Sequence, residues 1–275
     1  MAMLTLMCAA CSCSDATDTG IIEPRLVVEG YIDTDGYPSV FLTYTATGSD
    51  YDKSLSDKLI RWAKVSISDG DTTIILTGTP DFNIFPPYKY RTYEMTGTTG
   101  KTYSITAEYE GHRAVASSVM PAVTALDKIE FSPIEGNDSL RATFIHFTSP
   151  ADVPAYYVVS TRSITDDTAF HPCMMGAFEV SAPDKAYRIQ VYRAKSDVTP
   201  GDNDFIPHFR DGEQIAVKLS RVQKDVFEFW HIFDNEATFG SSQFINSVYN
   251  LPTNISGGIG IWSVQASSAM TATVQ

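Results

Sequence analysis

Hydrophobic and polar residues alternate along most of the chain, which is the period of half-buried β-strands. In the first part, strand-like alternation covers residues 26–32, 40–44, 63–67, 73–77, 103–109 and 115–119. Gly70 and Gly111 lie in tight acidic turns between such segments, which is typical of β-hairpins. This spacing of strands and turns predicts a β-sandwich over residues 23–121.

The alternation resumes after Pro121 with longer insertions. Strand-like segments cover residues 126–131, 140–147, 156–161, 187–191, 215–219, 259–264 and 270–275. We expect insertions at 162–186 and 194–212 and a second sandwich over residues 122–275. The predicted fold class is mainly β, with two immunoglobulin- or fibronectin-like β-sandwich domains in tandem and one amphipathic helix in the second.

The predicted helix lies near residues 221–236 and carries an apolar, aromatic stripe. Helical spacing relates Val222, Val226, Phe229, Trp230 and Phe233. Ser220 and Gln223 have the spacing of a capping box at its start. We expect the stripe to pack over an open end or edge of the second sandwich, and a partner-binding helix is the alternative.

Residues 1–22 follow a different pattern, which we interpret as the remnant of a signal and a tether, and residues 1–13 are an apolar run that ends in small residues and cysteines. This arrangement resembles the tail of a bacterial lipoprotein signal. A signal also needs a basic first region, and no Lys or Arg precedes Arg25. We therefore expect that the chain begins inside the apolar region of its signal. The run is too short for a transmembrane helix, which needs about 20 apolar residues.

Cys13 is the expected lipidation site, with Cys11 as the alternative, because small residues precede both. Cys13 leads into Ser14-Asp15-Ala16-Thr17-Asp18, which resembles the acidic segment that directs lipoproteins of Bacteroidetes to the cell surface. Two or more acyl chains anchor a protein stably. The expected location is the outer membrane, lipid-anchored and facing the cell exterior. A metal site at these cysteines is disfavoured, because zinc needs four ligands and no partner lies nearby.

Composition and charge narrow the function. The formal net charge of −13 argues against a nucleic-acid partner, which demands basic patches. Beyond residue 13, Cys173 is the one cysteine, so this region forms no internal disulfide. A catalytic Cys173–His171 pair is disfavoured because a nucleophile needs a base and a third, orienting group. The histidines lack metal-ligand spacing, so the sequence predicts no metal, no cofactor and no catalytic residues.

One aromatic segment is a candidate surface for a partner or ligand. It is rich in Pro and Tyr, and its candidate contact residues are Phe82, Phe85, Tyr88 and Tyr90. Exposed aromatic side chains on a loop suit a sugar, a peptide or a protein surface. The alternative is structural, with the Phe side chains under the sandwich and the Tyr side chains paired across strands.

Several segments, taken in order, resemble the DUF4249 family of outer-membrane lipoproteins from Bacteroidetes, over residues 23–275. The opening Pro-Arg-Leu-Val-Val-Glu-Gly-Tyr-Ile-Asp at 24–33 is similar to the start of that family. The segment Asn-Ile-Ser-Gly-Gly-Ile-Gly-Ile-Trp at 254–262 resembles its closing signature, with Trp262 in place of Phe. Gly257, Gly258 and Gly260 fit a structural role, since glycine allows positive φ and close backbone approach.

The resemblance implies a role beside a transporter and supplies no catalytic residues. Members of the family are often encoded beside a TonB-dependent receptor, a β-barrel of the outer membrane. The expected function is therefore an accessory subunit that captures or caps a nutrient, such as a peptide or glycan. The first alternative is an adhesion or structural lipoprotein that binds another protein or a glycan. The second is a hydrolase of a type that the sequence does not reveal.

Overall fold

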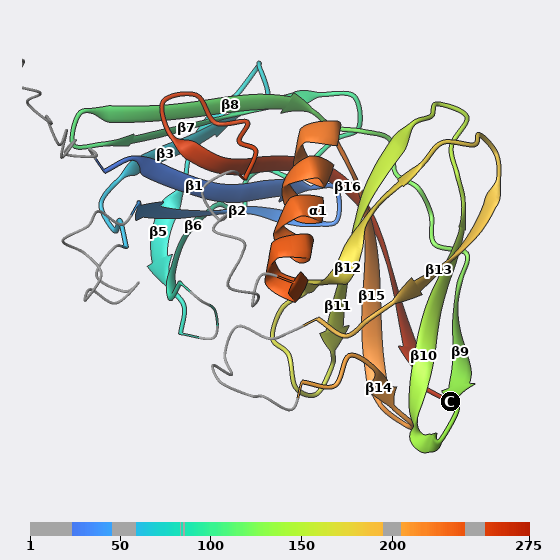
Figure 1. Cartoon of the computed structure of the whole chain (residues 1–275). Coiled ribbons are helices and arrows are strands. Elements are labelled where there is room, and N and C mark those ends of the chain that lie inside the picture. The colour runs from blue at the N-terminus through green and yellow to red at the C-terminus, as the bar shows by residue number, and fades with distance from the viewer. Residues whose placement is uncertain (1–23, 46–58, 83, 85, 195–204, 240–250) are drawn as a thin grey trace, which may run out of the picture.

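The computed structural model describes residues 24–45, 59–82, 84, 86–194, 205–239 and 251–275. Within these residues the fold is mainly β, as the alternation predicted, with three sheets and one helix, α1 (Lys224–Phe239). Figure 1 shows the helix standing in the angle between two sets of strands that run in different directions. The predicted lipidation sites Cys13 and Cys11 lie outside the described residues.

The largest sheet has eight strands and contains segments from both halves of the chain. Its order is β12 (His171–Val180), β11 (Ala155–Ser163), β15 (Gln214–Val222), β16 (Ile259–Thr273), β1 (Leu26–Asp33), β2 (Gly36–Tyr44), β6 (Tyr88–Arg91) and β5 (Thr77–Pro80). All neighbours are antiparallel except β1 and β16, which are parallel.

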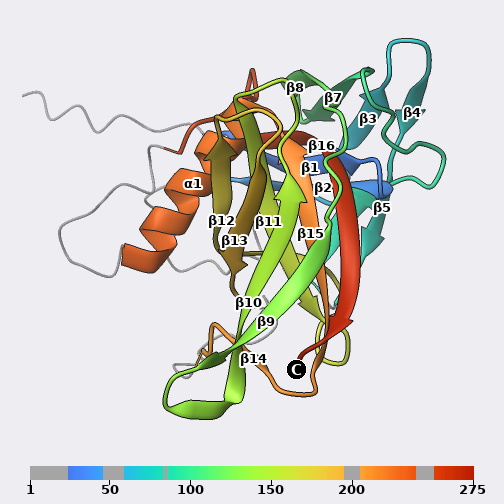
Figure 2. The ribbon, with the colours of Figure 1, turned by 90° about the vertical axis from the view of Figure 1, so that its right-hand side faces the viewer.

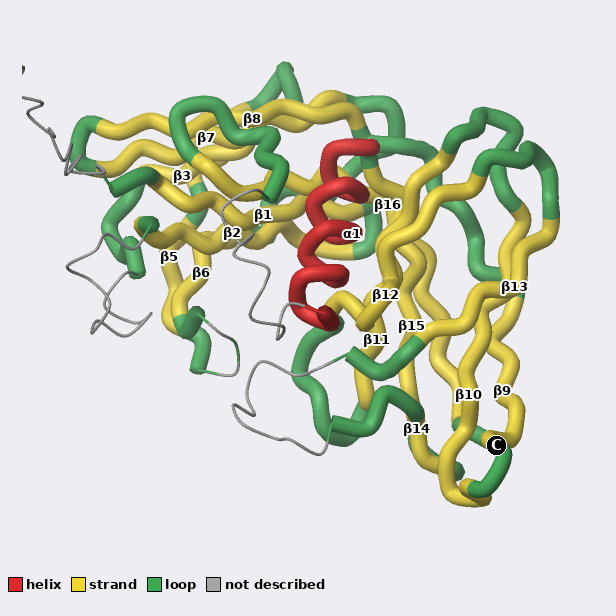
Figure 3. The backbone as a smooth tube through the Cα atoms, in the orientation of Figure 1, coloured by secondary structure: helices red, strands yellow, loops and turns green. Residues whose placement is uncertain are grey.

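Strand β16 joins the two halves of this sheet. Its first part, from Ile259 to Gln265, pairs with β1, and its second part, from Ala266 to Thr273, pairs with β15. The backbone trace shows the sheet bending along this strand (Figure 3). The predicted division of the chain at residues 121 and 122 stays a prediction, and the last strand of the chain contributes to both halves.

Two four-stranded sheets lie beside the large one (Figure 2). The first has the order β4 (Thr73–Ile75), β3 (Lys64–Ser68), β7 (Thr102–Tyr109) and β8 (His112–Val119). In the second, β10 (Asn137–Thr148) is the central strand, and its partners are β9 (Lys128–Ile134), β13 (Ala186–Val191) and β14 (Phe209–Arg210). Each small sheet packs on one half of the large sheet.

The two main hydrophobic cores lie on the same face of the large sheet. In β16, Trp262 and Val264 pack into the first core, and Met270 packs against the second. These residues share a face because side chains alternate along a strand. The same alternation places Val28 and Ile32 of β1 in the first core, as predicted. The other face of the large sheet is therefore free to carry the helix and an open surface.

The glycines before β16 have the structural role that the sequence predicted. Gly257 has φ +77° and Gly260 has φ +112°, a region that side chains with Cβ rarely adopt. A Cβ at Gly260 would collide with the Val28 carbonyl oxygen of β1, and one at Gly257 with the Arg113 carbonyl oxygen. Gly260 thus lets β16 approach β1 closely enough to form the parallel pair, and Gly257 lets the preceding turn approach β8.

Helix α1 starts later than predicted and packs over the large sheet, largely at its edge strand β12. Strand β15 continues to Val222, so the helix begins at Lys224. The predicted capping box is wrong, because Ser220 is a strand residue whose hydroxyl lies 2.8 Å from that of Ser267. The helix packs through Val226 against residues of the large sheet such as Ile261, on the face opposite the two main cores. Its neighbours include β12, the edge strand of the large sheet, which agrees with the expected packing over an edge.

The predicted insertion at 162–186 contains an edge strand of the large sheet. Strand β12 pairs with β11, and the pairing shifts register between Val158 and Ser160 of β11. Opposite this shift, Met175 adopts φ +56° and the chain bulges. A bulged, Met- and Gly-containing strand breaks the alternation, which explains why the sequence pattern did not reveal β12.

Candidate functional site

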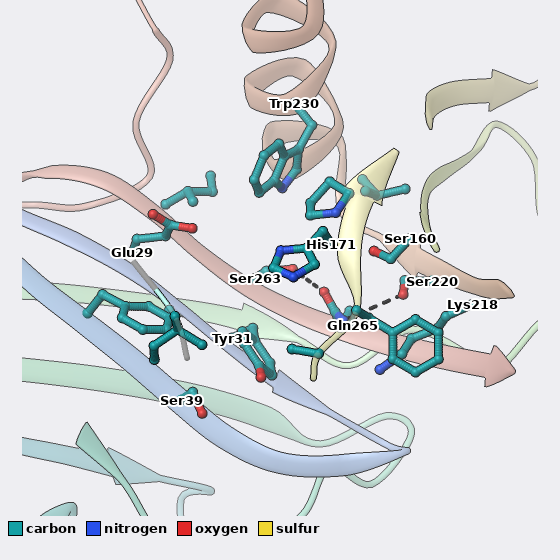
Figure 4. A pocket seen from close by; sticks show the side chains of 18 of the residues that line it. Glu29, Tyr31, Ser39, Ser160, His171, Lys218, Ser220, Trp230, Ser263 and Gln265 are labelled. Carbon is teal, nitrogen blue, oxygen red and sulfur yellow. Dashed lines mark hydrogen bonds between the residues drawn. The ribbon is translucent and has the colours of Figure 1, made fainter. Parts of the chain in front are cut away.

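A groove of about 400 Å³ opens on the face of the large sheet that carries α1 (Figure 4). Its lining comes from β1, β2, β6, β11, β12, β15 and β16, from the segments before β6 and β12, and from α1. The residues that characterise it are Tyr31, Arg162, His171, Lys218, Trp230 and Gln265. Since strands far apart in sequence build its floor, the groove is set by the fold and not by one loop.

Strand register arranges part of the floor in rows. Tyr31 of β1 pairs with Ser39 of β2 on one side and with Ser263 of β16 on the other. Paired residues point to the same side of a sheet. The next row toward the start of β1 has Glu29 beside Ile261. The floor therefore mixes aromatic, hydroxyl and carboxylate groups on rigid strands, which position side chains more accurately than loops do.

Two cations, one from β11 and one from β15, flank an aromatic ring in the wall of the groove. The Lys218 Nζ lies 4.7 Å from the centre of the Phe170 ring, and the Arg162 Cζ lies 5.4 Å from it. Lys218 pairs in register with Ser160, two residues before Arg162 on the same face of β11. Both distances are within the range of cation–π attraction, so the ring holds the two charged groups near each other.

A buried carboxylate anchors this side of the groove. The Asp33 side chain is 1% exposed, and its Oδ2 accepts hydrogen bonds from the Ser267 hydroxyl at 2.7 Å and the Gln265 amide at 2.8 Å. The Lys218 ammonium lies 3.5 Å from the same oxygen. A buried carboxylate is tolerated when it is paired and hydrogen-bonded in this way. Asp33 thus fixes the positions of Gln265 and Lys218.

The Gln265 amide is oriented from both ends. Its Oε1 accepts a hydrogen bond from the Ser263 hydroxyl at 2.9 Å, while its Nε2 donates to Asp33 and lies 3.5 Å from the Ser220 hydroxyl oxygen. Figure 4 shows Gln265 beside Ser263 and Ser220 on the groove floor. An amide held in this way presents a fixed polar edge to a ligand.

Aromatic rings stand at two other sides of the groove. Trp230 projects from α1 toward the opening, and Tyr31 lies across from it on β1 (Figure 4). Tyr31 is 37% exposed, so part of its ring faces the open space. The His171 ring lies between them. Flat rings with polar groups nearby suit a ligand that has both apolar faces and hydroxyl or charged groups.

The structure separates the four residues of the predicted aromatic contact segment. Phe82 is 84% exposed, and Phe85 lies outside the described residues. The Tyr88 side chain is half-buried, and its hydroxyl donates to the Arg61 carbonyl oxygen at 2.9 Å. From the same segment, Ile84 and Lys89 reach the rim of the groove.

Tyr90 is a core residue and not a contact residue. It is 2% exposed, and its hydroxyl donates to the Ile60 carbonyl oxygen at 2.8 Å and accepts from the Ala63 amide at 3.0 Å. Burial raises the pKa of Tyr90 to about 12. This corrects the expectation for Tyr90: its position in the chain suits a loop contact, but its ring fills the first core.

The geometry of Cys173 does not suit nucleophilic catalysis. Its thiol is buried in the second core, and this burial raises the pKa of Cys173 to about 12. A nucleophilic cysteine needs a lowered pKa and access to substrate. His171 instead lines the groove. Among the described residues, no group of three or more His, Cys, Asp or Glu side chains is arranged to hold a metal ion.

The sequence analysis did not find the groove, although its residues follow a simple pattern. Glu29 and Tyr31, like Ser263 and Gln265, are the polar-facing members of alternating strands. Such residues look like ordinary solvent-facing positions when the sheet order is unknown. The parallel pairing of β1 with β16, more than 200 residues later, brings them together.

The fold and the site define a mainly β protein with a groove of mixed aromatic, apolar and polar lining on one face of a bent sheet. A model of the family described as "Domain of unknown function (DUF4249)" matches residues 15–271. The chain therefore belongs to the DUF4249 family, as its sequence segments indicated. No curated protein matches the chain. In the part of the chain that the structure describes, no helix is long and apolar enough to cross a membrane.

Proposed function

We propose that this protein is a non-enzymatic lipoprotein of the Bacteroidetes outer membrane that serves a TonB-dependent receptor. In this proposal, acylated Cys13, or Cys11 as the alternative, anchors the chain with its folded part facing the exterior. The protein captures a nutrient in the groove and caps the receptor, so that the nutrient is enclosed between the two proteins. The −13 net charge agrees with a partner other than nucleic acid.

The observation that carries this proposal is the groove itself. Its volume of about 400 Å³ is within the range of small-molecule sites, and its polar groups are held by strands and by Asp33. A site that is shaped before the ligand arrives spends less free energy on ordering. Such a site suits capture and release of an unchanged ligand.

The two main hydrophobic cores support a more specific proposal about the fold. We propose that each half of the chain is an immunoglobulin- or fibronectin-like sandwich, with β16 shared between them. In this arrangement, the small sheets form the outer layers and the large sheet forms a common inner layer. The concave surface between the halves is then the natural place for a partner to dock.

The groove chemistry favours binding over hydrolysis. Acid–base hydrolysis of a glycoside needs a pair of carboxylates that flank the scissile bond. Glu29 is the one carboxylate residue in the described lining of the groove, and Asp33 nearby is buried under its hydrogen-bond donors. Cys173 is sealed in a core. The described groove therefore offers no matched acid and base for hydrolysis.

Copurification from cells tests the transporter role. The wild-type lipoprotein, extracted from outer membranes in mild detergent, should carry a β-barrel receptor with it. Cys13→Ala, or Cys11→Ala if Cys11 carries the lipid, should release the protein from the membrane and end the association. Recovery of a membrane-anchored lipoprotein with no receptor would contradict the proposal and favour the adhesion role.

A further inference from the structure

Arg162 lines the groove without a charge partner among the described residues. Its guanidinium contacts the Phe170 ring, and its Nε is buried with no hydrogen-bond acceptor in the described structure. Most other arginines of the fold have carboxylate partners: Arg221 lies 2.7 Å from Asp152, and Arg188 lies 2.6 Å from Glu130. A guanidinium carries five donors, so an unpaired one in a cavity wall is prepared to bind an anion.

Three cationic side chains line the described groove of a strongly acidic protein. Its described lining contains Lys89, Arg162 and Lys218, with Glu29 as the carboxylate, whereas the whole chain has a net charge of −13. Lys89 is paired with Asp81 at 2.8 Å and Lys218 lies 3.5 Å from Asp33, so Arg162 is the lining cation that has no carboxylate partner in the described structure. Such a cation in a cleft attracts ligands of the opposite charge.

We propose that the groove binds a carbohydrate that carries a carboxylate, that is, a uronic-acid type of sugar. This inference deepens the proposed function and rests on the groove being its capture site. The carboxylate lies between Arg162 and Lys218, where a planar guanidinium can make two parallel hydrogen bonds to it. Ser160, which is opposite Lys218 in the strand register and two residues before Arg162, and the fixed amide of Gln265 bind ring hydroxyls.

The aromatic groups fit the rest of such a ligand. Tyr31 and Trp230 offer flat faces at two other sides of the groove. The face of a sugar ring is largely apolar, because its C–H groups point there, and it packs well on such faces. The groove thus contains hydroxyl, amide, aromatic and cationic groups, and an acidic sugar offers a partner for each of them.

A peptide ligand fits less well. Extended peptides commonly bind by adding a strand to an open sheet edge. The floor of the groove is instead made largely by side chains of β1, β15 and β16, which are central strands with partners on both sides, and the edge strand β12 contributes the side chains of His171 and Pro172. The backbone groups of these strands are already paired, so the groove recognises its ligand through side chains.

Binding of trigalacturonic acid to the purified folded protein tests the inference. The matched probes are its methyl ester, which lacks the charge, a galactose 6-phosphate and a triglutamate peptide. We expect trigalacturonic acid to bind at least about 10-fold more tightly than its methyl ester, because a hydrogen bond to a charged group contributes about 1.5–3 kcal/mol. Isothermal titration calorimetry measures each affinity.

Two variants test whether Arg162 is responsible for the preference for the charged sugar. Arg162→Gln should weaken trigalacturonic acid by at least about 10-fold and leave the methyl ester nearly unchanged. Arg113→Gln, a largely exposed arginine of β8 outside the groove, should leave both affinities unchanged. If Arg162→Gln does not fold, the comparison of acid with methyl ester on the wild-type protein decides alone.

Each other outcome overturns the inference in a distinct way. Equal binding of acid and methyl ester removes the anion requirement but leaves the capture role in place. Tighter binding of galactose 6-phosphate or of the triglutamate peptide would show that the ligand belongs to another chemical class. No binding of any of these probes, with a receptor still copurifying, contradicts the inference while the proposed transporter role stands.

Discussion

Asn254 and Trp262 exchange two hydrogen bonds that mimic a backbone strand pair. The Trp262 amide donates to Asn254 Oδ1 at 2.8 Å, and Asn254 Nδ2 donates to the Trp262 carbonyl oxygen at 2.9 Å. The same Nδ2 also donates to the Asp225 carboxylate at 2.8 Å, in the first turn of α1. One side chain therefore ties the segment before β16, the strand itself and the helix over the groove.

Asn254→Ala should destabilise the fold by about 1–3 kcal/mol, since it leaves the partly buried amide and carbonyl of Trp262 without these partners. Ser256→Ala is the matched control, because the Ser256 side chain is exposed and its backbone makes the hydrogen bonds. Urea unfolding followed by circular dichroism measures both changes in the free energy of unfolding. Equal stability of the two variants would show that the Asn254 pairing carries no weight.

Gly260→Ala should be among the most damaging small substitutions in the chain. The new Cβ would meet the Val28 carbonyl oxygen, and φ +112° is strained for alanine. We expect a loss of more than about 2 kcal/mol or failure to fold, because strain at such positions alone costs about 1–3 kcal/mol. Gly36→Ala is the control, since a Cβ there meets nothing within 4 Å. Thermal melts of both variants decide, and an unchanged Gly260→Ala melt would contradict the close approach of β16 to β1.

Tyr90→Phe separates a core role from a binding role for the predicted aromatic segment. Loss of the hydroxyl leaves the Ile60 carbonyl and the Ala63 amide without a partner, which should cost about 1–3 kcal/mol. Tyr93→Phe, at a 60% exposed position, should change stability by less than about 0.5 kcal/mol. Chemical unfolding compares them. A stable Tyr90→Phe variant with weakened ligand binding would restore Tyr90 as a contact residue.

Asp234 of α1 predicts a measurable pH dependence. Burial raises the pKa of Asp234 to about 6, although the backbone amides of Ala177 and Gly176 and the nearby His231 act in the opposite direction. Because this value lies above the ordinary carboxyl pKa of 3.8, the folded protein holds the proton more tightly than the unfolded chain. The charged form of Asp234 therefore lowers stability at and above pH 6, and protonation relieves this as the pH falls toward 4.

Asp234→Asn removes that charge at every pH and tests this prediction. The variant should be more stable than the wild type at pH 7, and the difference should shrink as the pH falls from 6 to 4. Asp138→Asn, at an exposed position near the start of β10, should show no such trend. Melting temperatures across this pH range give the answer, and a difference that grows toward pH 4 would reverse the assigned sign.

The sequence predicted local features well and long-range ones poorly. Alternation located most strands, and the glycine signature correctly indicated the turn and close approach at Gly257 and Gly260. The helix was found from its apolar spacing, but its start was placed too early because Ser220 and Val222 continue a strand. The correct predictions and the small error all concern features that are read from residues close together in the sequence.

The groove depends on contacts that no local pattern contains. Tyr31 and Gln265 look like solvent-facing strand residues until β1 and β16 pair, and Asp33 looks like an ordinary turn carboxylate until Ser267 covers it. Tyr90 has the same appearance in sequence as an exposed loop tyrosine, since a buried hydroxyl with backbone partners leaves no mark on the chain. Sheet order supplies this missing information.

Site-specific photocrosslinking in intact cells tests most directly whether the groove faces a receptor. A benzophenone amino acid at Tyr31 places the probe in the groove, and one at Ser117 places it on the exposed face of β8, beyond the first core. We predict that the probe at position 31 forms an adduct with a TonB-dependent β-barrel receptor and that the probe at position 117 does not. An adduct from position 117 alone, or no receptor adduct from either position, would contradict the account.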